Sequence, residues 1–272
     1  MPTYTSHDGL TLFYTDEGQG IPLIALAGLT RNGADFDHVA PHLPVRLIRP
    51  DYRGRGQSNW ADPATYVIAQ EAADVVALMD HLGLEKAAVL GTSRGGLIAM
   101  LLAVTAKDRL LGVALNDIGP VIADRGLDVI RGYIGHNPAQ KTYAEAAAAR
   151  AKLWTHFKDV PMDRWLAEVT AQYKETPDGL TLRYDPRLRD AVLAAGAQPA
   201  PDLWPLFDAF AGLPLALIRG GNSDLLGIET ADEMSRRRPD MIRADVPGRG
   251  HVPFLDEPQA LNALHLWLEK MP

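Results

Sequence analysis

The sequence contains no cysteine among its 272 residues. Disulfide bonds, catalytic thiols and thiolate metal sites are therefore excluded, and cysteine usage gives no sign of the redox compartment. Basic residues are also in deficit, because 27 lysines and arginines stand against 34 acidic residues and the formal net charge is −7. A chain without a basic excess lacks the electrostatic footprint of nucleic-acid binding, so we expect no nucleic-acid partner.

Long apolar runs are missing as well. No stretch approaches the roughly 20 apolar residues of a membrane-spanning helix, and the first residues show no basic-then-apolar signal pattern. We therefore expect a cytoplasmic protein without a membrane partner. The composition is nevertheless 47% hydrophobic, which is enough for a substantial core, and the length suits one α/β domain with an insertion.

Strand-like apolar runs alternate with helical patterns in the first half of the chain. After a predicted hairpin, the runs lie at residues 22–27, 45–50, 87–90 and 111–115, and a helix with apolar residues at helical spacing covers 66–82. Such alternation is typical of a parallel sheet joined by right-handed crossovers. The sequence thus predicts an α/β fold with a mostly parallel central sheet flanked by helices.

The alternation breaks after residue 120 and resumes at residue 213. Residues 121–212 contain helical stretches but no strong strand, and they are too numerous for an ordinary loop. We expect a helical cap at 121–212, inserted after the sixth strand, and a core formed by residues 1–120 and 213–272.

The pattern Gly91-Thr92-Ser93-Arg94-Gly95 lies between a strand-like run and a helix-like run. In such a G-x-S-x-G turn the serine is held in a strained backbone conformation, and glycines two residues away on either side remove side chains that would collide. The turn lifts the serine hydroxyl out of the sheet. It also places the next backbone N–H at a helix N-terminus, where developing negative charge is favoured.

Asp224 and His251 follow the ends of later strand-like runs, at the sheet edge where α/β proteins bind ligands. A serine needs a base to take its proton, an imidazole titrates near neutrality, and a carboxylate behind the imidazole fixes its tautomer. We predict Ser93, His251 and Asp224 as the catalytic residues. Asp117 also ends a strand and is the alternative acid, but we interpret it as the partner of a nearby cation, with Arg94 the candidate.

These motifs resemble those of α/β-hydrolase-fold serine hydrolases, in which the chain order is also Ser, Asp, His. The matching stretches are Gly28-Leu29, residues 51–58, residues 91–96, residues 221–224 and residues 250–258. The resemblance implies the α/β-hydrolase fold, with a helical cap, and an oxyanion hole formed by the backbone N–H groups of Leu29 and Arg94. Many relatives have His-Gly before the first donor where this chain has Ala27-Gly28, but only backbone groups are needed.

The activity implied is hydrolysis of a carboxylic ester or lactone through an acyl-enzyme on Ser93, with no cofactor and no metal. Two alternatives stay open on the same fold. One is a carbon–carbon bond hydrolase of ring-cleavage products, whose relatives often have tryptophan where Val252 follows His251. The other is a non-catalytic small-molecule receptor. In each case the expected partner is a small molecule.

Arg94 and His136 are the candidates for substrate contact. Arg94 is placed either to recognise an anionic group or to form an ion pair beneath the cap, and His136 belongs to a Gly-His-Asn-Pro stretch suited to lining a pocket. The aromatic residues of the insertion are expected to pack the cap, with one or two in the pocket: Tyr133, Trp154, Trp165, Tyr173, Tyr184 and Trp204. Asp51, Arg53 and Arg55 are assigned to loop architecture.

Overall fold

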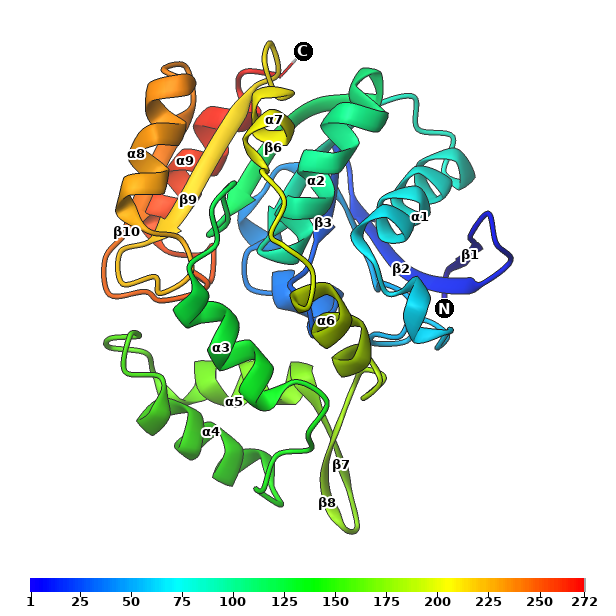
Figure 1. Cartoon of the computed structure of the whole chain (residues 1–272), viewed down its shortest axis with the longest axis vertical. Coiled ribbons are helices and arrows are strands. Elements are labelled where there is room, and N and C mark those ends of the chain that lie inside the picture. Colours follow the sequence, from blue (N-terminus) through cyan, green and yellow to red (C-terminus); the bar gives the residue numbers. More distant parts are fainter. Residues whose placement is uncertain (272) are drawn as a thin grey trace.

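The computed structural model describes residues 1–271, and its centre is an eight-stranded sheet (Figure 1). The strand order is β1-β2-β4-β3-β5-β6-β9-β10. Strand β2 pairs antiparallel with both of its neighbours, β1 and β4, and all the other pairings in this sheet are parallel. The strands are β1 (Thr3–Thr5), β2 (Thr11–Gly18), β3 (Ile21–Leu26), β4 (Val45–Pro50), β5 (Ala87–Thr92), β6 (Leu110–Asn116), β9 (Leu215–Gly220) and β10 (Ile242–Val246). The predicted mostly parallel sheet is confirmed.

Helices cover both faces of this sheet because its central strands are apolar on both sides. In β5, Ala87 and Val89 join the core on one face, whereas Ala88 and Leu90 join the core on the other. The first core is completed by α1 (Ile68–His81), α2 (Arg94–Thr105), α7 (Trp204–Asp208) and α8 (Ile228–Arg237), and the second by α9 (Pro258–Leu268). Among the helices of residues 1–271, none combines the length and apolar character needed to cross a membrane.

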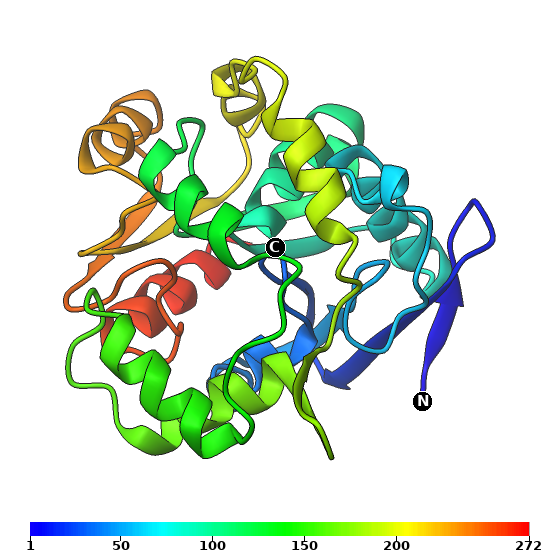
Figure 2. The same cartoon turned by 60° about the horizontal axis from the view of Figure 1, so that its bottom comes forward.

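Residues 121–212, which we call the insert, join β6 to β9 and lie mainly at the carboxyl ends of the parallel strands (Figures 1 and 2). Besides α7, the insert contains α3 (Asp124–Tyr133), α4 (Tyr143–Leu153), α5 (Met162–Gln172), β7 (Tyr173–Thr176), β8 (Gly179–Leu182) and α6 (Leu188–Gly196). Its predicted helical character is confirmed. The β7–β8 hairpin was not predicted, because strands of four residues carry too little pattern. That the insert is a separate cap domain stays a prediction.

Candidate active site

Ser93 lies at the turn between β5 and α2, with φ of 50° and ψ of −111°. This left-handed φ confirms the strained conformation predicted for the serine. The glycines around it allow close approach of the backbone: a Cβ atom on Gly91 would lie 2.5 Å from the nitrogen of Gly96, and one on Gly95 would lie 2.2 Å from the carbonyl oxygen of Leu26. The turn therefore depends on glycine at both positions.

Gly95→Ala should lower the free energy of unfolding by about 1–3 kcal/mol, because the added methyl group meets backbone of β3 that cannot rotate away. Chemical denaturation would measure the change. Gly132→Ala on α3 is the matched control, since a Cβ there meets nothing within 4 Å and alanine favours the helix. Equal unfolding free energies for Gly95→Ala and the wild type would contradict the close approach.

His251 connects Ser93 to a buried carboxylate. Its Nε2 lies 2.9 Å from Ser93 Oγ and its Nδ1 lies 2.8 Å from Asp117 Oδ2. An ionised carboxylate can only accept, so Nδ1 carries the proton and Nε2 is left to accept from the serine hydroxyl. Asp117 also accepts hydrogen bonds from the Gly220 N–H at 2.7 Å and from Ser223 Oγ at 2.6 Å, which fix the orientation of its carboxylate.

The prediction of Asp224 as the partner of His251 was wrong. Asp224 is half-buried and has no side-chain hydrogen bond within residues 1–271, whereas Asp117 is fully buried against the imidazole. The two aspartates follow β6 and β9, which are neighbours in the sheet, so both loops reach the same place. In the β9 loop it is Ser223 that turns toward the site, and it binds Asp117.

The expected ion pair between Arg94 and Asp117 was also wrong. Arg94 Nε donates to Glu71 Oε2 at 2.6 Å, and its Nη2 donates to the carbonyl oxygen of Tyr66 at 2.9 Å. The guanidinium is therefore bound to Glu71 and Tyr66 rather than to Asp117, and Arg94 does not line the cavity that contains Ser93 and His251. Of the two interpretations of Arg94, the structure supports the ion pair.

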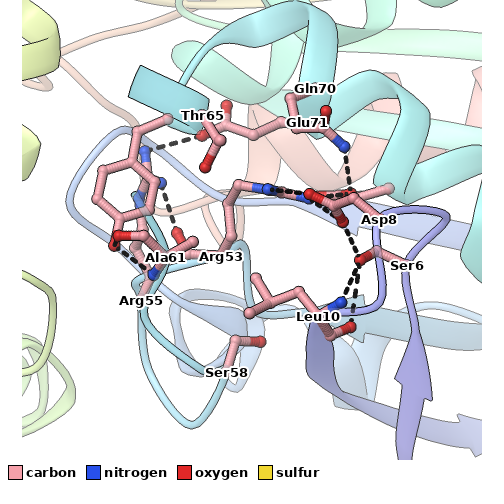
Figure 3. A network of polar contacts seen from close by, with 12 residues as sticks. Ser6, Asp8, Leu10, Arg53, Arg55, Ser58, Ala61, Thr65, Gln70 and Glu71 are labelled. Carbon is pink, nitrogen blue, oxygen red and sulfur yellow. Dashed lines mark hydrogen bonds and ion pairs between the residues drawn. The ribbon is translucent and has the colours of Figure 1, made fainter. Parts of the chain in front are cut away.

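A buried network of charged side chains supports the loop after β4 (Figure 3). Arg53 pairs with Asp8 and with Asp74, at 3.0 and 2.7 Å. Arg55 pairs with Glu71 at 2.9 Å and donates from Nε to the carbonyl oxygen of Leu29 at 3.1 Å. The network thus holds the backbone at Leu29, which lines the same cavity as Ser93. Arg53 and Arg55 support loop architecture, as predicted.

Asp51 also supports these loops, although it forms no ion pair within residues 1–271. Its carboxylate accepts hydrogen bonds from the backbone N–H groups of Gly33 and Gln57, each at 2.8 Å. These bonds join the loop after β3 to the loop after β4. Asp51 is therefore architectural, as predicted.

Ser93 and His251 line a cavity of about 340 Å³ between the sheet and the insert. Leu29 lines it from the loop after β3, and Tyr133, Trp154 and Tyr173 line it from the insert. Within the described chain, no hydrogen bond is donated by the backbone N–H of Leu29 or Arg94. Both groups retain their capacity to bind a ligand oxygen.

The other sequence candidates lie elsewhere. His136 is exposed and lines an adjacent hollow of about 130 Å³ rather than the cavity at Ser93. Trp165 is buried inside the insert, Tyr184 packs in a separate small cluster, and Trp204 contacts Phe207 on α7. Within residues 1–271, no cluster of three or more histidine or carboxylate side chains is suited to a metal ion.

Sequence reasoning missed the charged groups in the cavity wall. Arg31 pairs with Asp35 at 2.6 Å and with Glu168 on α5 at 2.5 Å. Burial lowers the pKa of Arg31, but the two carboxylates outweigh it and raise that pKa overall. Burial raises the pKa of Asp35 to about 6, against the attraction of Arg31. Arg31 and Asp35 are only four residues apart, but Glu168 lies 137 residues away from Arg31, and no short motif joins all three.

Three comparisons relate the chain to known proteins. A model of the Alpha/beta hydrolase family matches residues 23–264. A 3-hydroxybutyrate-oligomer hydrolase from Cupriavidus necator is 38% identical over 247 residues, covering 87% of this chain and 84% of that protein. A 2-(acetamidomethylene)succinate hydrolase from Mesorhizobium japonicum is 27% identical, covering 89% and 85%. The crystal structure of an alpha/beta hydrolase from Novosphingobium aromaticivorans matches with a TM-score of 0.91 at 37% identity, covering 98% and 97%.

Proposed function

The chain belongs to the alpha/beta hydrolase family of enzymes, and from this premise we propose that it is a serine hydrolase that cleaves a carboxylic ester or lactone. The observation that carries the proposal is the continuous series of contacts from Ser93 Oγ through His251 to Asp117. Ser93 and His251 line a cavity, whereas Asp117 is buried behind them. The Cupriavidus relative supports the choice of bond, since it is named a hydrolase of 3-hydroxybutyrate oligomers and such oligomers are joined by esters.

In the proposed mechanism, Ser93 attacks the ester carbonyl while His251 Nε2 takes the hydroxyl proton. His251 then returns this proton to the departing alcohol, which leaves an acyl-enzyme on Ser93. His251 next activates water, which attacks the acyl carbon and releases the carboxylic acid. Asp117 keeps the Nδ1 proton in place and stabilises the imidazolium in both steps.

The oxyanion of each tetrahedral intermediate is assigned to the backbone N–H groups of Leu29 and Arg94. Their lack of other acceptors within the described chain supports this role. Arg94 begins α2, so its N–H also carries the favourable end of the helix dipole. Each such donor contributes about 3–4 kcal/mol to transition-state stabilisation in serine hydrolases.

Covalent trapping during turnover tests the proposal. The wild-type protein should hydrolyse p-nitrophenyl butyrate and the linear dimer of 3-hydroxybutyrate, and a fluorophosphonate should add one label per chain, mapped by peptide mass spectrometry to Ser93. Turnover should fall in proportion to labelling, and Ser93→Ala should take no label. Full turnover in a completely labelled protein would contradict the mechanism. Stoichiometric binding without turnover would favour the receptor alternative.

A further inference from the structure

Arg150 is a buried cation in the cavity wall with an unused hydrogen-bonding edge. It lies on α4, lines the cavity that contains Ser93, and is only 8% exposed. Its Nη2 donates to Gln172 Oε1 at 2.5 Å, but its Nη1 is buried with no hydrogen-bond partner in the described chain. A buried donor without an acceptor is destabilising, and more so on a charged group. An anionic acceptor at this edge of the guanidinium would remove that cost.

Arg31 provides the contrast within the same cavity. It is held by two carboxylates, those of Asp35 and Glu168, whereas no carboxylate within residues 1–271 lies within 4 Å of the Arg150 guanidinium. Glu168 attracts Arg150 electrostatically, but its hydrogen bond is with Arg31. Burial lowers the pKa of Arg150, and the nearby charge of Arg31 lowers it further, as expected of an undercompensated cation.

Aromatic rings hold the Arg150 guanidinium in place. Its central carbon lies 4.8 Å from the ring centre of Trp154 and 5.8 Å from that of Tyr173, and both rings also line the cavity. Stacking on aromatic faces suits arginine and reduces the freedom of its side chain. The guanidinium is thus already ordered before any ligand arrives, which lowers the entropic cost of binding.

We propose that Arg150 binds a carboxylate of the substrate, so that the natural substrates of this enzyme are small esters that carry a free carboxylate. The inference rests on the proposed ester hydrolysis at Ser93 and specifies its substrate class. The planar fork of arginine matches a carboxylate, and one cavity contains both Arg150 and the nucleophile. A volume of about 340 Å³ is at the small end of ligand sites, which favours a short molecule.

A substrate pair that differs in one charge tests this inference. The linear dimer of 3-hydroxybutyrate carries a carboxylate, its methyl ester does not, and both contain the same internal ester, whose cleavage chromatography would follow. In the wild type, kcat/KM for the free acid should exceed that for the methyl ester by at least about 10-fold. Arg150→Met should remove this preference, mainly through a higher KM for the acid.

The dimer places the carboxylate on the departing alcohol, so a second pair covers the acyl side. Mono-p-nitrophenyl glutarate carries the carboxylate on the acyl group, and p-nitrophenyl butyrate is its neutral counterpart. An Arg150-dependent preference in one pair shows on which side of the ester the carboxylate lies. No preference in either pair would overturn the inference, and so would an equal loss on charged and neutral esters in Arg150→Met.

Two further variants separate charge recognition from structural damage. Arg150→Lys keeps a cation and should retain part of the preference for the acid. Arg131→Met removes a half-exposed arginine of the insert that pairs with Asp128 and does not line the cavity, and it should leave the preference unchanged. Circular dichroism and thermal unfolding of Arg150→Met would establish that this variant is folded.

Binding to Ser93→Ala keeps the inference independent of turnover. Calorimetric titration with the free-acid dimer and its methyl ester should show tighter binding of the acid, and the difference should vanish in Ser93→Ala/Arg150→Met. Carboxylate-dependent binding without hydrolysis by the wild type would support Arg150 as the anion site and reject the proposed function. Ser93-dependent hydrolysis without carboxylate preference would reject only the role of Arg150.

Discussion

Asp117→Asn should lower kcat for ester hydrolysis by about 10⁴-fold and leave KM nearly unchanged. The amide fills the same space, but it can donate a hydrogen bond to Nδ1 and so favour the tautomer whose proton is on Nε2, facing Ser93. In that tautomer the imidazole can no longer accept the serine proton. The equivalent replacement in serine proteases has an effect of this size. Steady-state kinetics on p-nitrophenyl butyrate would measure it.

Asp224→Asn is the control for this replacement. Asp224 ends the neighbouring loop but has no side-chain hydrogen bond in the described structure, so kcat should stay within about threefold of wild type. A loss of 10⁴-fold in Asp224→Asn with little change in Asp117→Asn would reverse the assignment of the acid. Similar small effects in both variants would mean that neither carboxylate orients His251.

The carboxylate that contacts His251 marks the limit of what the sequence could predict about the proposed catalytic residues. Ser93 and His251 stand out because glycines and strand ends surround them, and the structure brings them together. The choice between Asp117 and Asp224 depends on which side chain turns inward at the ends of two adjacent strands, β6 and β9. That choice depends on backbone angles such as the φ of 55° at Asp117, which periodicity does not encode.

The fold was easier to predict than the cavity because different physics determines each. The parallel sheet follows from apolar strands that pack on both faces, a repetitive pattern readable from local sequence. The cavity wall is assembled from the loop after β3 and from α4, α5 and β7 of the insert, whose contacts join distant segments. Arg150 therefore looked like any helical arginine until its neighbours were known.

The second large effect expected is on stability, at Glu71 on α1. This side chain is fully buried, and its carboxylate lies 2.9 Å from Arg55 and 2.6 Å from Arg94 (Figure 3 shows Arg55 and Glu71). Glu71→Gln keeps the volume but leaves two guanidiniums without their counter-ion. Breaking a buried pair from one side costs about 3–5 kcal/mol, so the free energy of unfolding should fall by that amount in chemical denaturation.

Glu233→Gln is the matched control, because Glu233 also pairs with two arginines, Arg236 and Arg237, but on the exposed face of α8. Solvent screens that cluster, so its loss should leave the free energy of unfolding unchanged within error.

The double variant Glu71→Gln/Arg55→Met should be more stable than Glu71→Gln, since it removes one of the uncompensated charges. If Glu71→Gln instead unfolds like the wild type, the buried carboxylate does not stabilise the fold through its charge. Catalytic activity adds an independent readout, because Arg55 also binds the Leu29 carbonyl beside the proposed oxyanion hole.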